Sequence, residues 1–319
     1  MGSVIAGEQQ SSKRQGEDQT HRKDGGKSEP RLRTAIIGTG NVGTDLLLKV
    51  MASQYLSCEL FAGRRADSAG IQRARAKGVT TSTHGIKAVA DLRDSFDVVF
   101  DATSAADAKA HWEVLRPLGV QVIDLTPANL GKLCIPALNL DDCLGEQYVS
   151  MISCGGQAAV PIGHCMQQVA AERLRYLEIA STSAAVSVGP ATRANIDEYV
   201  EVTERATREI CGAEATKTIL VISPAKPEVV MRNTIAVRSD EAVDMSALRL
   251  AVEDMEARIQ AYVPGYRIVV PPISTEERIM VSAEVQGRGD WLPPYAGNLD
   301  IITCAGVALA EARAMAACS

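Results

Sequence analysis

The spacing of apolar residues predicts alternating strands and helices in the first half of the chain. A short apolar run at residues 32–37 is followed at once by a glycine-rich block at 38–43. Beyond this block, the apolar residues from Leu46 to Met51 recur at the spacing of one helix face. Further elements are expected as strands at 58–62, 98–100 and 120–123 and as a helix at 71–77. Strands that alternate with helices predict a parallel sheet with right-handed crossovers.

The second half of the chain has longer helical patterns and strands of a mixed sheet. Helices are expected from near Pro161 to Arg173 and at 194–210 and 246–261, with strands at 177–183, 218–222, 234–237 and 279–285. A closing helix is expected at 299–317. The pattern predicts two domains, at 32–150 and 151–298, with the closing helix returning to the first.

The first 31 residues differ from the rest in composition. Between Gly7 and Pro30 there is no aliphatic, aromatic, Met or Cys residue. Such a segment cannot bury enough apolar surface to offset the entropy of ordering it. It also lacks the apolar stretch of a secretory signal. We expect a disordered polar extension that takes no part in the chemistry.

Composition and charge argue against several classes of protein. The net charge of -6 disfavours a nucleic-acid surface, and no apolar run reaches the roughly 18 residues of a membrane-spanning helix. The eight cysteines form no C-x-x-C pair, which argues against a zinc ribbon or a disulfide scaffold and for a reducing, cytoplasmic location. The four histidines show no metal-ligand spacing, so no metal site is expected.

The glycine-rich block predicts a dinucleotide site. Its G-x-G-x-x-G pattern follows a predicted strand and opens a helix, the context that gives this motif meaning. Gly38 permits the tight turn, Gly40 lets the backbone approach a pyrophosphate, and Gly43 allows close packing. Arg64 and Arg65 stand at the end of the second strand, where NAD-binding proteins usually carry an acidic residue. NAD is favoured, but an arginine here also suits the 2′-phosphate of NADP.

Cys154 is the expected nucleophile. A strand leads into it, two glycines follow it, and a helix starts nearby. A helix N-terminus favours a thiolate and lowers the thiol pKa, and bare backbone N–H groups suit an oxyanion. The thiolate would add to an aldehyde, and the adduct would lose a hydride to a nicotinamide, leaving an acyl thioester. Water, phosphate or a thiol remains open as the acceptor of the acyl group.

Seven sequence blocks resemble the acylating acetaldehyde dehydrogenases of meta-cleavage pathways, which act in the breakdown of aromatic hydrocarbons. These blocks occur in the family's order at residues 35–46, 100–105, 123–128, 154–158, 189–198, 261–266 and 295–301. The resemblance implies an α/β protein with an N-terminal Rossmann domain and a C-terminal α+β domain of the glyceraldehyde-phosphate-dehydrogenase type. It also implies the conversion of acetaldehyde or propanal, CoA and NAD to acyl-CoA and NADH.

The same resemblance implies site residues and partners. Cys154 would carry the acyl thioester, and Asn233 stands at the second catalytic position. Cofactor contacts are implied for Thr39, Gly40, Asn41, Val42, Ser187, Val188, Gly189, Pro190, Ala191, Thr192, Arg193, Ala194, Asn195 and Asn298. A homodimer and a complex with a 4-hydroxy-2-oxovalerate aldolase are also expected.

The sequence departs from the family pattern in three places. Asn233 replaces an aspartate that is thought to help activate the thiol, and an amide cannot accept a proton at neutral pH. The stretch between Tyr266 and Trp291 is shorter than in the relatives. Arg64 and Arg65 replace an acidic neighbourhood, as described above.

Two other functions stay open at this point. Another semialdehyde dehydrogenase of the same architecture would need a basic residue for phosphate or a substrate carboxylate, and Arg193 or Arg232 would serve. A non-catalytic NAD(P)-sensing protein is the second alternative, although it would have no need of Cys154.

Overall fold

The computed structural model describes residues 31–170, 174–238, 243–275 and 278–318. The predicted polar extension lies almost wholly outside these residues. None of the described helices is long and apolar enough to cross a membrane.

The first sheet has the strand order β3-β2-β1-β4-β5-β7-β6, and its paired strands are all parallel. Its strands are β1 (Leu32–Ile37), β2 (Leu56–Ala62), β3 (Thr81–Ser82), β4 (Val98–Asp101), β5 (Gln121–Asp124), β6 (Lys132–Leu133) and β7 (Tyr148–Ser150). Its helices are α1 (Asn41–Ala52), α2 (Ala69–Ala76), α3 (Ile86–Asp91), α4 (Ala105–Leu115) and α5 (Pro136–Asn139), with short 3₁₀ turns at Arg93–Ser95, Arg116–Leu118 and Asp141–Cys143. Every residue of β4 is buried, as expected of a central parallel strand.

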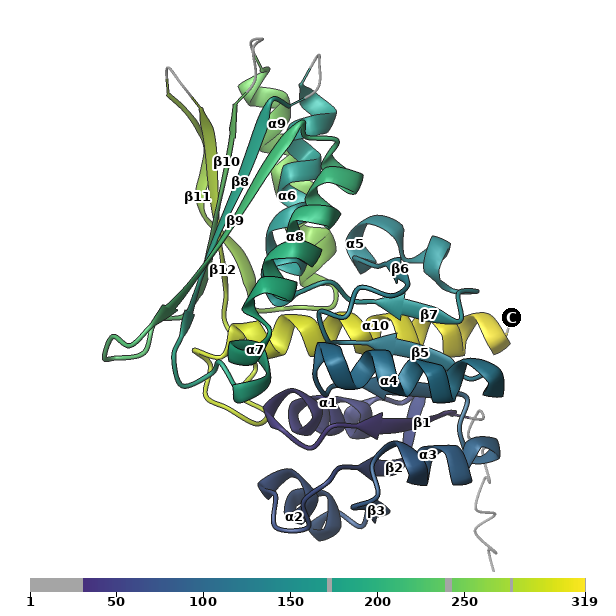
Figure 1. The fold of residues 1–319 in the computed structure, drawn as a ribbon. Helices are drawn as coiled ribbons and strands as arrows, with labels where there is room; N and C mark the ends of the chain where they lie inside the picture. Colours follow the sequence, from purple (N-terminus) through teal and green to yellow (C-terminus); the bar gives the residue numbers. More distant parts are fainter. Residues whose placement is uncertain (1–30, 171–173, 239–242, 276–277, 319) are drawn as a thin grey trace, which may run out of the picture. The chain divides into compact units, whose positions relative to one another are not determined.

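The second sheet has the order β11-β12-β10-β8-β9 and is mixed, because β8 and β9 pair in parallel while the other pairs are antiparallel. Its strands are β8 (Tyr176–Ala184), β9 (Ala215–Ser223), β10 (Met231–Arg238), β11 (Tyr266–Ser274) and β12 (Ile279–Val285). Helices α6 (Cys154–Val169), α8 (Ile196–Cys211) and α9 (Met245–Gln260) lie on one face of it (Figure 1). The short helix α7 (Pro190–Ala194) precedes α8.

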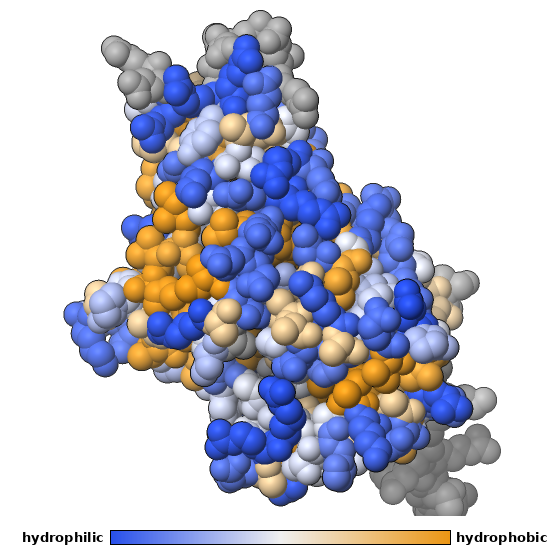
Figure 2. Space-filling model, in the orientation of Figure 1, coloured by the Kyte–Doolittle hydropathy of each residue, from blue (hydrophilic) through white to orange (hydrophobic). Residues whose placement is uncertain are grey.

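The opposite face of the second sheet carries no described helix. Strand β9 alternates along its length, so that Leu220 points toward the helices while Ile219 and Val221 are exposed. Figure 2 shows apolar residues gathered over the strands of this sheet. An apolar patch of this kind on a sheet face is typical of a surface that contacts another protein.

Three details of the second half of the chain differ from the sequence-based expectation. Helix α6 starts at Cys154 itself rather than near Pro161, because Ser153 caps the helix and Pro161 is accommodated inside it. The helix expected at 194–210 is divided at Asn195, which leaves helical geometry between α7 and α8. Strand β11 was not predicted, since adjacent prolines at 271 and 272 and many exposed positions conceal it.

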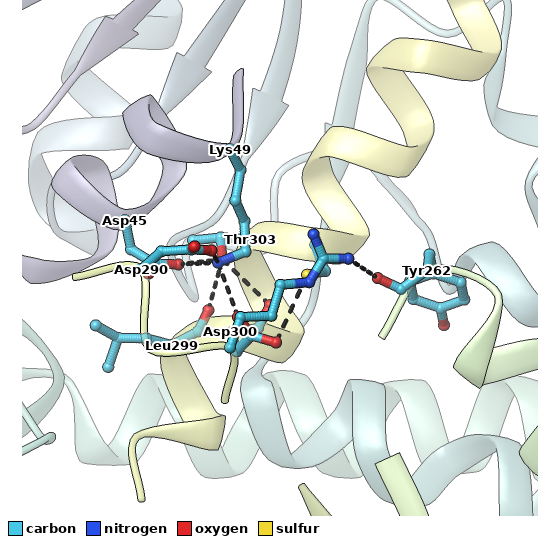
Figure 3. Close-up of polar contacts among 9 residues, drawn as sticks. Asp45, Lys49, Tyr262, Asp290, Leu299, Asp300 and Thr303 are labelled. Carbon is cyan, nitrogen blue, oxygen red and sulfur yellow. Dashed lines mark hydrogen bonds and ion pairs between the residues drawn. The ribbon is translucent and has the colours of Figure 1, made fainter. Parts of the chain in front are cut away.

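The last helix, α10 (Gly297–Cys318), packs against α1 of the first sheet. A charge cluster joins them (Figure 3): the buried ammonium of Lys49 lies 2.8 Å from Asp45, 2.8 Å from Asp300 and 2.9 Å from the exposed Asp290. Burial alone would lower the pKa of Lys49, but Asp45, Cys304 and Asp300 raise it overall. The three carboxylates therefore have a counter-charge within the chain. The cluster fixes the first turn of α10, which carries Asn298.

Candidate active site

A cleft of about 940 Å³ lies where the turn after β1, the start of α6, the loop before α8 and the start of α10 meet. Predicted site residues that line it are Gly40, Asn41, Val42, Cys154, Ser187, Val188, Gly189, Thr192, Asn195 and Asn298. The lining does not include Thr39, Pro190, Arg193, Ala194 or Asn233. The cleft therefore joins the expected dinucleotide turn to the expected nucleophile.

The turn between β1 and α1 has the geometry that a dinucleotide needs. Gly38 has a φ of +107°, and a Cβ there would lie 2.4 Å from the carbonyl oxygen of Ala102. A Cβ at Gly43 would lie 1.8 Å from the carbonyl oxygen of Gly38. Around Gly40 there is open space, and no side chain caps the first N–H groups of α1. Free N–H groups at an open helix start fit a pyrophosphate.

Asn298 fits the nicotinamide end of the cofactor. Its Nδ2 donates to the carbonyl oxygen of Ser187 at 3.4 Å. Its Oδ1 is buried and has no hydrogen-bond partner among the described residues. A buried acceptor of this kind is costly unless a donor reaches it. The carboxamide N–H of a nicotinamide is such a donor, so the residues present fit NAD.

The two arginines after β2 lie at the surface. Arg64 forms an ion pair with Asp107 at 3.3 Å, and Arg65 forms one with Asp67 at 3.0 Å. Their side chains are 79% and 76% exposed, so neither guanidinium is fixed by burial. Arg64 has the freedom to meet a 2′-phosphate or to stay paired with Asp107.

A strained turn sets Cys154 at the first position of α6. Ile152 has a φ of +66°, which is an outlier for a β-branched residue. The hydroxyl of Ser153 then accepts the N–H of Gly156 at 2.9 Å and caps the helix. Gln157 donates from Nε2 to the carbonyl oxygen of Met151 at 2.8 Å, which closes the turn from the other side. Strain held in this way is common at catalytic positions.

The electrostatic setting of Cys154 differs from the expectation. Burial raises the pKa of its thiol to about 11, while the Tyr199 hydroxyl and the N–H groups of Gly155 and Cys154 act in the opposite direction. The expected lowering of the pKa was wrong, because removing the sulfur from water disfavours the charged form by more than the helix start favours it.

Asn233 belongs to a polar layer behind the cleft. It is buried on β10, and its Oδ1 accepts the hydroxyl of Ser181 at 2.6 Å. Ser181 and Ser183 occupy inward positions of β8, where Leu177 and Ile179 are core residues. Sequence analysis missed both serines and Tyr199. Polar residues at inward positions of an apolar strand face are the signal that would have found the serines.

Two basic residues considered for substrate binding have other contacts. The guanidinium of Arg193 donates to the carbonyl oxygens of Val188 and Ala185 at 3.1 and 2.8 Å and supports the loop from outside the cleft. Arg232 pairs with Glu284 at 2.8 Å, on the face of the second sheet away from the helices. Neither guanidinium is among the residues that line the cleft.

Comparison with known proteins decides the family. Residues 154–293 match the model "Prokaryotic acetaldehyde dehydrogenase, dimerisation", and residues 33–142 match "Semialdehyde dehydrogenase, NAD binding domain". "Acetaldehyde dehydrogenase 2" of Salinispora arenicola is 63% identical over 282 residues, which are 88% of this chain and 95% of that protein. The chain belongs to the acetaldehyde dehydrogenase family.

More distant relatives agree with this assignment. An acetaldehyde dehydrogenase of Pectobacterium atrosepticum is 47% identical over 88% of this chain and 95% of its own length. The solved structure of aspartate semialdehyde dehydrogenase with NADP from Candida albicans has the same fold, with a TM-score of 0.60 at 13% identity over 88% of this chain and 98% of that one. The predicted resemblance, the two-part fold and the enzyme class, an NAD-dependent aldehyde dehydrogenase, are confirmed. The matched dimerisation region also supports a homodimer.

Proposed function

We propose that this protein oxidises acetaldehyde or propanal to the corresponding acyl-CoA, with NAD as oxidant and an acyl thioester on Cys154 as the intermediate. The observation that carries the proposal is the shared cleft: Cys154 and the open turn at Gly40 line the same cavity. Hydride transfer requires the aldehyde carbon and the cofactor to meet, and this cavity is where both can reach. The names of these relatives support acetaldehyde as the substrate.

The chain's own groups account for each step of the reaction. The Cys154 sulfur bonds to the carbonyl carbon, and the N–H groups at the start of α6 stabilise the oxyanion that forms. The oxyanion then collapses to a thioester as the carbon gives up its hydrogen with the bonding electron pair. NAD, when bound, supplies the acceptor for that hydride. The CoA thiol then attacks the thioester, the bond to sulfur breaks, and Cys154 is released.

The alternative of a phosphorylating or other semialdehyde dehydrogenase fits the cleft less well. Such an enzyme needs a basic residue placed for phosphate or for the substrate's carboxylate. Both arginines considered for this role bind elsewhere. The lining of the cleft contains neither a Lys nor an Arg, which favours a small uncharged aldehyde.

The formation of NADH, followed by its absorbance with acetaldehyde and NAD, tests the proposal. The assay is run with CoA, with inorganic phosphate in its place, and with neither, and is then repeated with NADP. Sustained turnover that needs CoA is the expected result. Turnover that needs phosphate would instead favour the semialdehyde alternative, and cofactor binding without any turnover would favour a sensor.

The assembly that we propose is a homodimer formed through the exposed face of the second sheet, where Ile219 and Val221 lie. Light scattering should give twice the chain mass of 33.9 kDa. A further complex with a 4-hydroxy-2-oxovalerate aldolase is proposed from the family resemblance and is tested by co-elution of the two purified proteins. We place the reaction in the cytoplasm, because the described cysteines are free thiols.

A further inference from the structure

Tyr199 is fixed beside the start of α6. It lies in the first turn of α8, is only 4% exposed, and lines the cleft. One turn later, the hydroxyl of Thr203 donates to the carbonyl oxygen of Tyr199 at 2.6 Å and lies 2.7 Å from the hydroxyl of Ser153. The cap of α6 and the first turn of α8 are thereby joined, so the Tyr199 ring has a defined position relative to Cys154.

Gly155 shows where the Tyr199 hydroxyl lies. A Cβ at this glycine would come within 2.1 Å of the hydroxyl oxygen of Tyr199 and 2.5 Å of Oγ of Ser181. Both hydroxyls therefore lie directly over the residue that follows Cys154. Any larger residue at position 155 would displace them. The absence of a side chain at Gly155 thus leaves room for the phenol of Tyr199.

The proton of the Tyr199 hydroxyl has few acceptors. The hydroxyl makes no close hydrogen bond with another described residue, although it is buried. Ser181 donates its own proton to Oδ1 of Asn233 at 2.6 Å, so toward Tyr199 it can only accept. The amide of Asn233 takes no proton at neutral pH. Oγ of Ser181, Oγ of Ser153 and the Cys154 sulfur are the acceptors left within reach, and Ser153 already accepts the N–H of Gly156.

No other titratable side chain competes for this role in the cleft. Among the described residues, those that line it include no Asp, Glu, His, Lys or Arg, and Cys154 and Tyr199 are the titratable groups there. The cysteine therefore has no adjacent general base or cation to favour its ionised form. The phenol is the one acidic donor that the described chain brings to the sulfur.

Resting on the proposed function, we propose that Tyr199 is a further catalytic residue, whose phenol donates a hydrogen bond to the Cys154 sulfur and favours the thiolate that attacks the aldehyde. Ser181, whose own proton is directed to Asn233, is an acceptor that competes with the sulfur for the phenol. Burial and the neighbouring sulfur raise the pKa of Tyr199, so it keeps its proton and acts as a donor rather than a base. The proton of the thiol passes to water in the cleft.

The test compares Tyr199→Phe with the parent protein by the rate at which iodoacetamide alkylates Cys154, followed by mass spectrometry of its peptide as a function of pH. Loss of the phenol should shift the profile to higher pH and slow alkylation at neutral pH by about tenfold, the effect of one pKa unit. Tyr262→Phe is the matched control, because its hydroxyl is also buried without a partner but lies at a different cavity. The control should alkylate at the parent rate.

A second variant should change the alkylation rate of Cys154 in the opposite direction. Ser181→Ala removes one acceptor that competes with the sulfur and should speed alkylation at neutral pH, because the phenol then donates to the Cys154 sulfur more of the time. An unchanged profile in Tyr199→Phe, or slower alkylation in both variants, would overturn the proposal. Alkylation needs neither aldehyde nor NAD. Failure of the proposed function would appear only in the NADH assay, so the alkylation result and the NADH result are independent of each other.

Discussion

The starts of α1 and α6 are two versions of the same feature, since each helix follows a parallel strand of the first sheet and opens onto the same cleft. At α1, Gly40 leaves the terminus uncapped and the space around it open. At α6, the hydroxyl of Ser153 caps the terminus, and Cys154 sits behind a strained turn at Ile152. The start of α1 is therefore free to bind a ligand, whereas the start of α6 is capped by a side chain of the protein.

This difference explains why a helix start does not have the same electrostatic effect in both places. An open terminus keeps its partial positive charge for an anion that arrives from solvent. At the capped terminus the Cys154 side chain is half-buried, and the loss of solvation raises the pKa of its thiol to about 11. The start of α6 fixes the position of the Cys154 sulfur, and another group must stabilise its thiolate form.

Removing the nucleophile should have the largest effect. Cys154→Ser keeps the size and the cap but replaces the thiol by a hydroxyl, a much poorer nucleophile. We expect CoA-dependent turnover to fall by at least about 10³-fold, while NAD affinity, measured by fluorescence titration, stays near the parent value. Turnover at the parent rate would contradict a thioester at this position.

Filling the open space at the start of α1 should weaken NAD binding without changing the reactivity of Cys154. A Cβ at Gly40 would meet no atom within 4 Å, so Gly40→Val should fold normally and enter the space that we assign to the pyrophosphate. We expect NAD affinity to weaken by about tenfold or more, or ~1.4 kcal/mol, with Cys154 alkylation unchanged. Gly145→Ala is the control, since it also meets no neighbour. Unchanged NAD affinity in Gly40→Val would show that the pyrophosphate lies elsewhere.

Removing the side-chain cap of α6 should lower the stability of the protein, because Ser153 holds the start of that helix. Ser153→Ala deletes the acceptor for the N–H of Gly156 and removes the contact between the hydroxyls of Ser153 and Thr203. A loss of about 1 kcal/mol of unfolding free energy is expected, the usual cost of an N-cap, and denaturant titration measures it. Stability equal to the parent would mean that the cap does not hold the turn.

The smallest effect is expected at the adenosine end of the open terminus. Arg64→Asp places a negative charge beside Asp107 and opposes a 2′-phosphate. We expect NADP affinity to fall a few-fold more than NAD affinity, because an exposed charge is screened by solvent. Equal effects on both cofactors, read from paired titrations, would remove any role of Arg64 in 2′-phosphate binding.

The sequence could predict the open terminus because its signal is local. A buried strand, the glycines at 38, 40 and 43 and an amphipathic helix occupy about twenty consecutive residues. The start of α6 was harder to predict, since Gly155, Gly156 and Pro161 all read as helix-breaking while the fold accommodates them. Its position depends on packing that no short window contains.

The polar layer behind the nucleophile could not be predicted from any local pattern. Ser181 and Asn233 are 52 residues apart and meet only because β8 and β10 pair in antiparallel register. Tyr199 reaches Gly155 from a third element. Sequence analysis therefore identified Asn233 alone, by resemblance, and expected the helix start to lower the thiol pKa. Burial, which the sequence does not show, reverses that expectation.

The central claim is that Cys154 carries the acyl group, and a single turnover without CoA tests it most directly. The protein is mixed with acetaldehyde and NAD, NADH is counted against active sites, and the peptides are analysed by mass spectrometry. We predict a burst of one NADH per site and one acetyl group on the peptide that contains Cys154, released when CoA is added. A burst with no acetyl group on Cys154, or with the group on another residue, would contradict the account.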